Sequence, residues 1–366
     1  MEKEAENGET AGREETLLYL HIPFCDSKCH YCAFNSYVDR FELRSAYMRS
    51  VLTQLRHDLE RFAVAPGTVA TLFIGGGTPS TVSPLLYEPF FETLSPFLAP
   101  DAEITSEANP NSASREWLEG MRSLGVNRIS FGVQSFFDDK LKLLGRAHKS
   151  GDAADAVERA AAVGFDHLSL DLIYATLLDT PERVDREIDR ALALPVDHLS
   201  AYELTIEEGT PFQKTPEVRK ESIAQARLIK DRTEAAGWRQ YEISNFGRHL
   251  CRHNLGYWQY RPYLGIGSGA VGRVGSERYY PRTELEHYIE NPLARRLEPL
   301  DDDAVREEKV FLGLRSVVGV DPDLLTPSQR ARCDLLEREG KLRLEEGRYR
   351  NPDFLLADEI ALFILD

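Results

Sequence analysis

Cysteine is scarce in this sequence, with only five among 366 residues, and three of the five stand within eight positions of one another. So few thiols, so closely grouped, make a poor disulfide framework for a chain of this size. The group Cys25, Cys29 and Cys32 is better explained as a set of metal ligands. Of the other two, Cys333 is expected to be structural, and Cys251 is either a thiolate ligand or an inert buried thiol.

The sequence also has no uncharged apolar run of about 18 residues and no start of the signal-peptide kind. We therefore expect no transmembrane segment and a cytoplasmic location. Basic residues are outnumbered, with 44 Lys and Arg against 60 Asp and Glu and a net charge of −16. Binding to a phosphate backbone needs clustered basic side chains, so a nucleic-acid partner is disfavoured.

Large apolar side chains are missing from residues 1–15 after Met1, whereas six glutamates are present. Such a segment buries too little surface to order itself, so we predict a disordered acidic tail. The chain as a whole is 42% hydrophobic and 28% charged, which is typical of a globular protein. Its length suits one large core of the barrel class and a smaller appended domain.

Apolar patterning over residues 16–240 alternates between strand and helix periods. Six strands are expected, each followed by an amphipathic helix, at residues 17–24, 70–74, 103–108, 128–134, 168–174 and 199–206. Alternation at this spacing indicates parallel strands joined by crossover helices. The fold class is therefore α/β. Six units favour an incomplete (β/α)6 barrel, and an open doubly wound sheet is the alternative.

From residue 241 the pattern becomes irregular and rich in glycine and aromatic residues, and we assign 241–302 to a connecting segment. Residues 303–366 are expected to form a small α+β C-terminal domain, with a helical segment and a hairpin over Leu342–Arg350. In a barrel or a wound sheet the functional site lies at the carboxyl ends of the strands. Several polar and glycine residues of this sequence fall at those ends.

The loop His21–Cys32 spaces its cysteines as C-x3-C-x2-C, and three thiolates on so short a loop can close around a [4Fe–4S] cluster. The fourth iron is left for the amino and carboxylate groups of S-adenosylmethionine (SAM), which an electron from the cluster cleaves to give a 5′-deoxyadenosyl radical. A zinc loop with His30 as the fourth ligand is the alternative. After the second strand, the glycine-rich turn Gly75–Pro79 permits close backbone approach to such a ligand.

These motifs, with Glu107-Ala-Asn-Pro110, Phe131-Gly-Val-Gln134 and Asp171-Leu-Ile-Tyr174, resemble those of the oxygen-independent coproporphyrinogen III oxidase family of radical SAM proteins. The resemblance covers residues 16–366 and implies an electron donor for the cluster. It also implies SAM contacts from Tyr19, Gly76, Gly77, Thr78, Glu107, Gln134, Arg146 and Asp171. One departure is Ala175–Asp179, where the family has a stretch rich in glycine and proline.

Two functions are compatible with this resemblance: decarboxylation of coproporphyrinogen, and haem carriage by the HemW-type branch of the family. The oxidases place a fourth cysteine two residues beyond the third, where this sequence has Phe34. They also carry a substantial segment ahead of the barrel, where about 16 residues precede the first expected strand here. Both differences favour the haem carrier, and the enzymatic alternative stays open.

The segment Cys251–Trp258 contains the H-N-x-x-Y pattern associated with haem in the HemW-type branch, which implies haem contacts from His253, Asn254 and Tyr257. Imidazole is an established haem ligand, although each of these side chains also suits a structural role. Arg252 is a candidate partner for a haem propionate. The resemblance thus implies haem as cargo and haem-acceptor proteins as partners, and it is compatible with peripheral contact with a membrane.

Overall fold

The computed structural model describes residues 15–366, so the acidic tail expected over 1–15 lies outside the described residues except for Glu15. Six parallel strands lie side by side in chain order within one sheet. They are β1 (Thr16–Ile22), β4 (Val69–Gly76), β5 (Leu98–Ala108), β6 (Arg128–Gln134), β7 (His167–Tyr174) and β8 (His198–Glu203). The predicted α/β fold with six parallel strands is confirmed.

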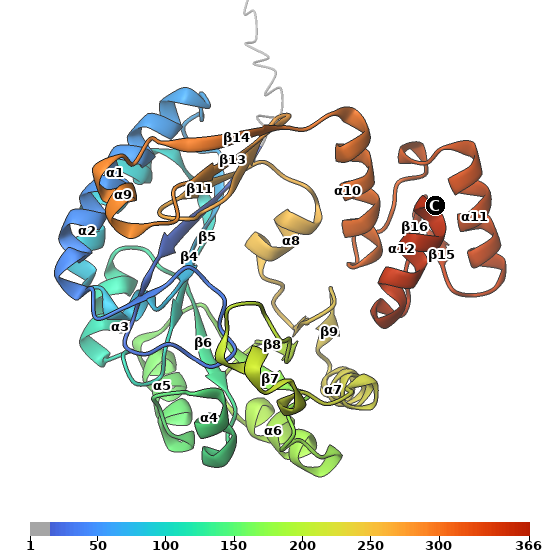
Figure 1. Ribbon diagram of the computed structural model, residues 1–366, viewed down its shortest axis with the longest axis horizontal. Coiled ribbons are helices and arrows are strands. Elements are labelled where there is room, and N and C mark those ends of the chain that lie inside the picture. Colours follow the sequence, from blue (N-terminus) through green and yellow to red (C-terminus); the bar gives the residue numbers. More distant parts are fainter. Residues whose placement is uncertain (1–14) are drawn as a thin grey trace, which may run out of the picture.

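Crossover helices cover the outer face of the curved sheet (Figure 1). They are α1 (Arg44–Arg61), α2 (Pro84–Leu94), α3 (Arg115–Ser123), α4 (Asp138–Leu144), α5 (Ser150–Val163), α6 (Pro181–Ala193) and α7 (Ile223–Ala235). Their apolar stripes form the main core with the strands, where Val51 of α1 and Leu18 of β1 are both fully buried. Within residues 15–366, no helix combines the length and the apolar character needed to cross a membrane.

The sheet extends beyond these six strands at both edges. On the β1 side, β11 (Tyr263–Ile266) runs parallel to β1, followed by the antiparallel strands β12 (Gly272–Val274), β13 (Glu277–Pro281) and β14 (Arg295–Pro299). On the β8 side lie the antiparallel strands β10 (Asn245–Gly247) and β9 (Arg239–Gln240). The segment 241–302, which the sequence pattern suggested to be irregular, thus contributes the five strands β10 to β14 to this sheet.

Short elements fill the connections. The pair β2 (Phe24–Cys25) and β3 (Tyr37–Val38) brackets the cysteine loop. Helix α8 (Arg252–Trp258) precedes β11 in the chain, and α9 (Leu285–Glu290) lies between β13 and β14. In Figure 1, α8 stands in the opening of the curved sheet. The 3-10 helices are η1 (Phe41–Leu43), η2 (Pro79–Thr81), η3 (Ser95–Phe97), η4 (Pro211–Lys214), η5 (Pro216–Val218), η6 (Pro322–Leu324) and η7 (Phe354–Leu356).

The C-terminal elements pack around a second hydrophobic cluster, which includes Val310, Leu314 and Ile364. They are α10 (Asp302–Leu314), α11 (Pro327–Arg338), β15 (Arg343–Glu345), β16 (Arg348–Arg350) and α12 (Ala357–Leu365). The predicted hairpin is confirmed, with both residues of its turn, Glu346 and Gly347, at positive φ. In Figure 1, α10 lies between α8 and the other helices of this unit.

Candidate functional site

Two adjoining cavities lie on the inner side of the sheet. The first, here called the cysteine cavity, measures about 750 Å³ and is lined by the cysteine loop and by the carboxyl ends of the parallel strands. The second, here called the inner cavity, measures about 990 Å³ and lies between the sheet and helices α8 and α10. Residues that line both are Ala33, Phe34, Gly76, Glu107, Asp171 and Tyr202. Ligands in the two cavities would therefore be neighbours.

All three clustered cysteines line the cysteine cavity. The hydroxyl group of Thr78 donates to Cys25 Sγ at 3.5 Å, and Arg146 Nη1 donates to Cys29 Sγ at 3.5 Å. Burial raises the pKa of Cys25 and the pKa of Cys32, so these thiols favour the protonated state when no metal is bound. The two donors are placed to stabilise thiolates once a metal is present.

Two adjacent glycines of the turn after β4 allow the loop and the strand to approach closely. Gly77 N donates to Ile22 O at 2.8 Å, and a Cβ atom on Gly77 would lie only 2.8 Å from the carbonyl oxygens of Ile22 and Phe24. Gly76 has φ of 110°, and a Cβ atom there would meet the His21 ring at 2.4 Å. The packing therefore requires glycine at both positions.

Two half-buried carboxyl groups lie on the wall that the cavities share. Glu107 Oε2 accepts from Gly76 N at 3.1 Å, and Asp171 Oδ1 accepts from the Ser130 hydroxyl at 3.3 Å. Burial, and then the neighbouring Asp171, raise the pKa of Glu107 to about 8. Burial raises the pKa of Asp171 to about 6. A ligand that carries a sulfonium and an ammonium group would supply the positive charge that these carboxylates lack.

A polar group at the end of β6 faces the same cavity without a protein partner. Gln134 has a positive φ of 64°, and its Oε1 is buried and unpaired within the described chain. Nearby, Arg146 Nη2 donates to Asn109 Oδ1 and to Gly132 O, both at 2.6 Å. Asn109 Nδ2 in turn donates to the Thr78 hydroxyl at 3.1 Å. Sequence analysis did not single out Asn109, although it lies within the Glu107–Pro110 motif.

The donor set fits an iron–sulfur cluster better than a single metal ion. Within residues 15–366, no three His, Cys, Asp or Glu side chains converge closely enough to hold one ion. In a [4Fe–4S] cube each thiolate binds a separate iron, so the thiols need only line one cavity. The histidine proposed for zinc is engaged elsewhere, since His30 Nδ1 is 2.9 Å from Leu143 O and its ring packs on Phe212.

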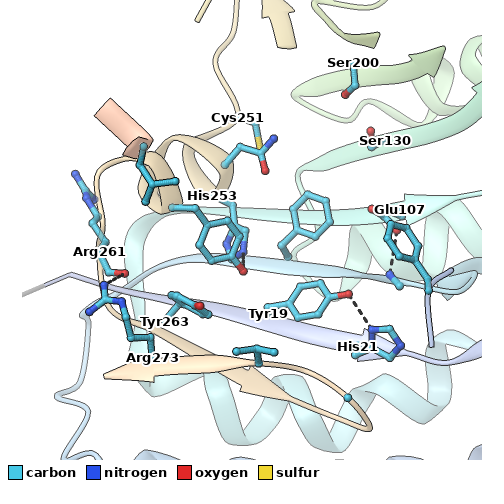
Figure 2. A pocket seen from close by; sticks show the side chains of 18 of the residues that line it. Tyr19, His21, Glu107, Ser130, Ser200, Cys251, His253, Arg261, Tyr263 and Arg273 are labelled. Atoms are coloured by element: carbon cyan, nitrogen blue, oxygen red, sulfur yellow. Dashed lines mark hydrogen bonds between the residues drawn. The ribbon is translucent and has the colours of Figure 1, made fainter. Parts of the chain in front are cut away.

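Seven of the eight expected SAM contacts line the cysteine cavity, and Tyr19 does not. Its side chain lies in the inner cavity, where its hydroxyl group is 2.9 Å from His21 Nδ1 (Figure 2). His21 Nε2 lies 2.7 Å from Asn35 O, which can only accept, so Nε2 carries the proton. Tyr19 therefore donates to Nδ1 and helps to fix the base of the cysteine loop.

The H-N-x-x-Y residues His253, Asn254 and Tyr257 all line the inner cavity. His253 is buried, with Nδ1 2.7 Å from the Thr71 hydroxyl and Nε2 2.9 Å from the Tyr257 hydroxyl. Burial lowers the pKa of His253 to about 3, so the imidazole is neutral, as a metal ligand must be. Binding a metal through Nε2 requires the Tyr257 hydroxyl to move aside.

The two residues that precede His253 contact acidic residues of β5. Cys251 is buried, burial raises its pKa to about 12, and its Sγ lies 3.6 Å from Glu103 Oε1. It is an inert thiol rather than a thiolate ligand. Arg252 Nη1 donates to Asp101 O at 2.5 Å and pairs with Asp101 Oδ2 at 3.2 Å, away from the cavity lining. A propionate contact from Arg252 is not supported.

The partial barrel and its cysteine loop define the class of the protein. The family model of the radical SAM superfamily matches residues 19–199. Among solved structures, coproporphyrinogen III oxidase (HemN) from Escherichia coli superposes with a TM-score of 0.79 at 23% identity, covering 96% of this chain and 90% of that one. The protein is therefore a radical SAM protein, a class that implies an iron–sulfur cluster and SAM.

Curated relatives narrow this class. The heme chaperone HemW of Bacillus subtilis is 34% identical over 319 residues, covering 82% of this chain and 84% of the relative. HemW of Mycobacterium tuberculosis (strain H37Rv) is 36% identical over 375 residues, with 95% and 94% covered. HemW of Escherichia coli is 40% identical over 270 residues, with 70% of each chain covered. The chain belongs to the HemW family.

Proposed function

We propose that this protein is a haem chaperone, which binds haem in the inner cavity and transfers it to acceptor proteins. The observation that carries the proposal is that the H-N-x-x-Y residues line a cavity of about 990 Å³ in a chain whose relatives are named heme chaperones. That volume lies near the upper end of the range for ligand pockets, about 300 to 1,000 Å³. The lining includes the aromatic rings of Phe73, Tyr257 and Tyr263, which suit a flat apolar macrocycle.

In this proposal Cys25, Cys29 and Cys32 would hold a [4Fe–4S] cluster, which in its reduced form would supply the electron that cleaves SAM. The chain's own residues position SAM. Glu107 and Asp171 accept from its ammonium group or ribose hydroxyls, and the remaining contacts come from Gly76, Gly77, Thr78, Gln134 and Arg146. The unpaired Gln134 Oε1 supports such a ligand, because a buried acceptor without a partner is costly.

The proposal also names partners and a location. Haem-acceptor proteins receive the cargo, and a separate electron donor reduces the cluster. We place the protein in the cytoplasm, with peripheral membrane contact available to it during transfer. The acidic balance of the chain, with a net charge of −16, supports the expectation that nucleic acid is not a partner.

One observation favours a second candidate, the decarboxylation of coproporphyrinogen. The two cavities share Glu107, Asp171 and Phe34, so a tetrapyrrole in the inner cavity would lie next to SAM in the cysteine cavity. That adjacency is what radical chemistry on a tetrapyrrole side chain requires. The HemN fold is the same, which is compatible with either function.

Anaerobic cluster reconstitution followed by two assays tests the proposal. We expect haem binding without coproporphyrinogen turnover, and we expect weaker haem binding in His253→Ala but not in the control His287→Ala, whose side chain is exposed on α9. Iron content is expected to fall in Cys29→Ala and to persist in Cys251→Ala. Turnover to protoporphyrinogen without haem uptake would overturn the chaperone assignment and support the oxidase.

A further inference from the structure

One end of the inner cavity is basic, although the protein as a whole is strongly acidic. Arg261 lies between α8 and β11, Arg273 lies on β12 and Arg278 lies on β13. Figure 2 shows Arg261 and Arg273 gathered with Tyr263 at one end of the pocket, and Glu107 at the opposite end. Three guanidinium groups at one end of an aromatic cavity are suited to anionic groups of a ligand.

A carboxylate of the protein itself already occupies part of this end. Glu308 of α10 accepts from Arg278 Nη2, at 2.6 Å through Oε1 and at 2.7 Å through Oε2. The hydroxyl group of Tyr260 donates to Glu308 Oε2 at 2.6 Å. Burial would raise the pKa of Glu308, but these hydrogen bonds outweigh burial and its pKa is lowered. The group is thus held as a carboxylate by charge-assisted hydrogen bonds.

The three arginines differ in what holds them. Arg273 is buried, donates to the backbone oxygens of Tyr260 and Arg261 at 2.6 and 2.7 Å, and stacks on the Tyr260 ring. Arg273 therefore fixes the chain between α8 and β11. The side chain of Arg261 is 38% exposed and pairs with Glu15 at the surface. Surface pairs of this kind contribute little, so Arg261 is available to another carboxylate.

We propose that Arg261 and Arg278 bind the propionate carboxylates of the cargo, with Arg273 as a positioning residue, and that Glu308 occupies the Arg278 site until the cargo enters. The inference rests on the proposed haem function and deepens it by orienting the ligand. Haem carries two propionates on one edge, so that edge points to the arginines. The apolar ring then lies among Phe73, Tyr257 and Tyr263, which line the same cavity.

Entry of the cargo has a consequence for helix α10. Glu308, Phe311 and Leu312 of this helix all line the inner cavity. When a propionate replaces Glu308 at Arg278, the helix loses its ion pair to the sheet. Helix α10, which forms the wall of the cavity on the side of the C-terminal unit, is thus held less tightly once haem is bound.

The decisive comparison uses the reconstituted wild-type chain with two probes, ferric haem and haem dimethyl ester, whose propionates are uncharged. We expect the ester to bind about tenfold more weakly, as loss of a charge-assisted hydrogen bond implies. Arg278→Gln should weaken haem binding to a similar degree without weakening ester binding further. Glu308→Gln, which removes the competing carboxylate, should tighten haem binding. Arg252→Gln is the matched control, since Arg252 pairs with Asp101 outside the cavity.

The outcomes distinguish failure of the propionate site from failure of the proposed haem function. Equal affinity of the wild type for haem and for the ester would overturn the propionate site while leaving the haem function intact, and it requires no variant to fold. If Arg278→Gln and the wild type bound haem equally well and had the same melting temperature, the propionate site would likewise be overturned. If the wild type binds neither probe, the proposed function itself fails, and the propionate site fails with it.

Discussion

At the scale of single residues, Glu107 is a carboxyl group whose ionisation the fold opposes. Burial and Asp171 raise its pKa from 4.5 to about 8. Because the folded state then holds a proton that the unfolded state releases, the ligand-free protein loses stability as pH rises from 4.5 to about 8. A cationic ligand favours the carboxylate, so SAM binding should strengthen as pH rises toward about 8 and level off above it.

Glu107→Gln should remove both effects. We compare melting temperatures without ligand at a pH below 4.5 and at a pH above about 8. Between these two pH values, the melting temperature of the variant should fall less than that of the wild type. Its SAM affinity at the higher pH should drop about tenfold, as the loss of one charge-assisted hydrogen bond implies. Melting curves and equilibrium binding of SAM measure the two effects. Glu158→Gln, on the exposed side of α5, is the control. Unchanged pH slopes in Glu107→Gln would contradict the assignment.

Gly76, Glu107, Gln134 and Asp171 could be placed at one site from the sequence because they lie toward the carboxyl ends of neighbouring parallel strands, and those ends meet at one rim. Tyr19, also expected to contact SAM, lies on β1 and lines the inner cavity. Sequence reasoning missed Arg128, a buried charge near Glu103, because pairing between strands far apart in sequence leaves no local pattern. Ala175 begins the stretch that departs from the family pattern, and its positive φ of 67° is a conformation that glycine adopts without strain.

At the scale of elements, a buried ion cluster joins α4, α6 and the loop after β7. Lys140 Nζ donates to Asp179 Oδ1 at 2.7 Å and to Glu187 Oε2 at 2.8 Å, and all three side chains are buried. Asp179 Oδ2 also accepts from the backbone and hydroxyl of Thr176, both at 2.8 Å. The one ammonium group thus compensates two carboxylates and fixes the loop that follows β7.

Lys140→Met should cost about 3 to 5 kcal/mol, because it leaves two buried carboxylates without their cation. Burial already raises the pKa of Glu187, and loss of Lys140 raises it further. When the pKa of a carboxyl group is higher in the folded than in the unfolded protein, ionisation of that group destabilises the fold. The loss of stability in Lys140→Met should therefore grow as pH rises. Chemical denaturation at several pH values measures this. Lys142→Met, exposed on the same helix, should change stability by no more than about 0.5 kcal/mol. Equal losses in the two variants would contradict the role of the cluster.

The six βα units were predictable because each strand and helix carries its own hydrophobic period. The edge strands were not. β11 has four residues, two of which are fully buried, and it pairs with β1 from far earlier in the chain. A strand that short has no clear alternation, and its pairing is set by the free edge of β1 rather than by local sequence. The strands β12 to β14, which extend the sheet beyond β11, could not be predicted from the sequence for the same reason.

At the scale of the whole molecule, the described chain has a large core and a separate C-terminal one. The main cluster runs from Leu18 to Tyr288, and the C-terminal cluster from Val310 to Ile364, with no residue in common. Polar contacts connect the two units, such as the hydrogen bond from Val317 N to Tyr241 O at 2.9 Å and the Arg227 to Asp353 ion pair at 3.2 Å. Segments joined in this way commonly open as separate cooperative units.

Leu314→Ala tests whether the predicted C-terminal unit over 303–366 unfolds on its own. Leu314 is fully buried in the second cluster, so its truncation should cost that unit about 2 to 5 kcal/mol. Native-state hydrogen exchange should then accelerate in α10, α11 and α12 while β4 to β7 keep their protection. Leu72→Ala, fully buried in the main core, is the matched control and should accelerate exchange in the barrel strands. If Leu314→Ala accelerated exchange equally in both units, the chain would unfold as one cooperative unit. The ion pair from Arg278 to Glu308 would then lie inside that unit and would not be a contact that the cargo can release.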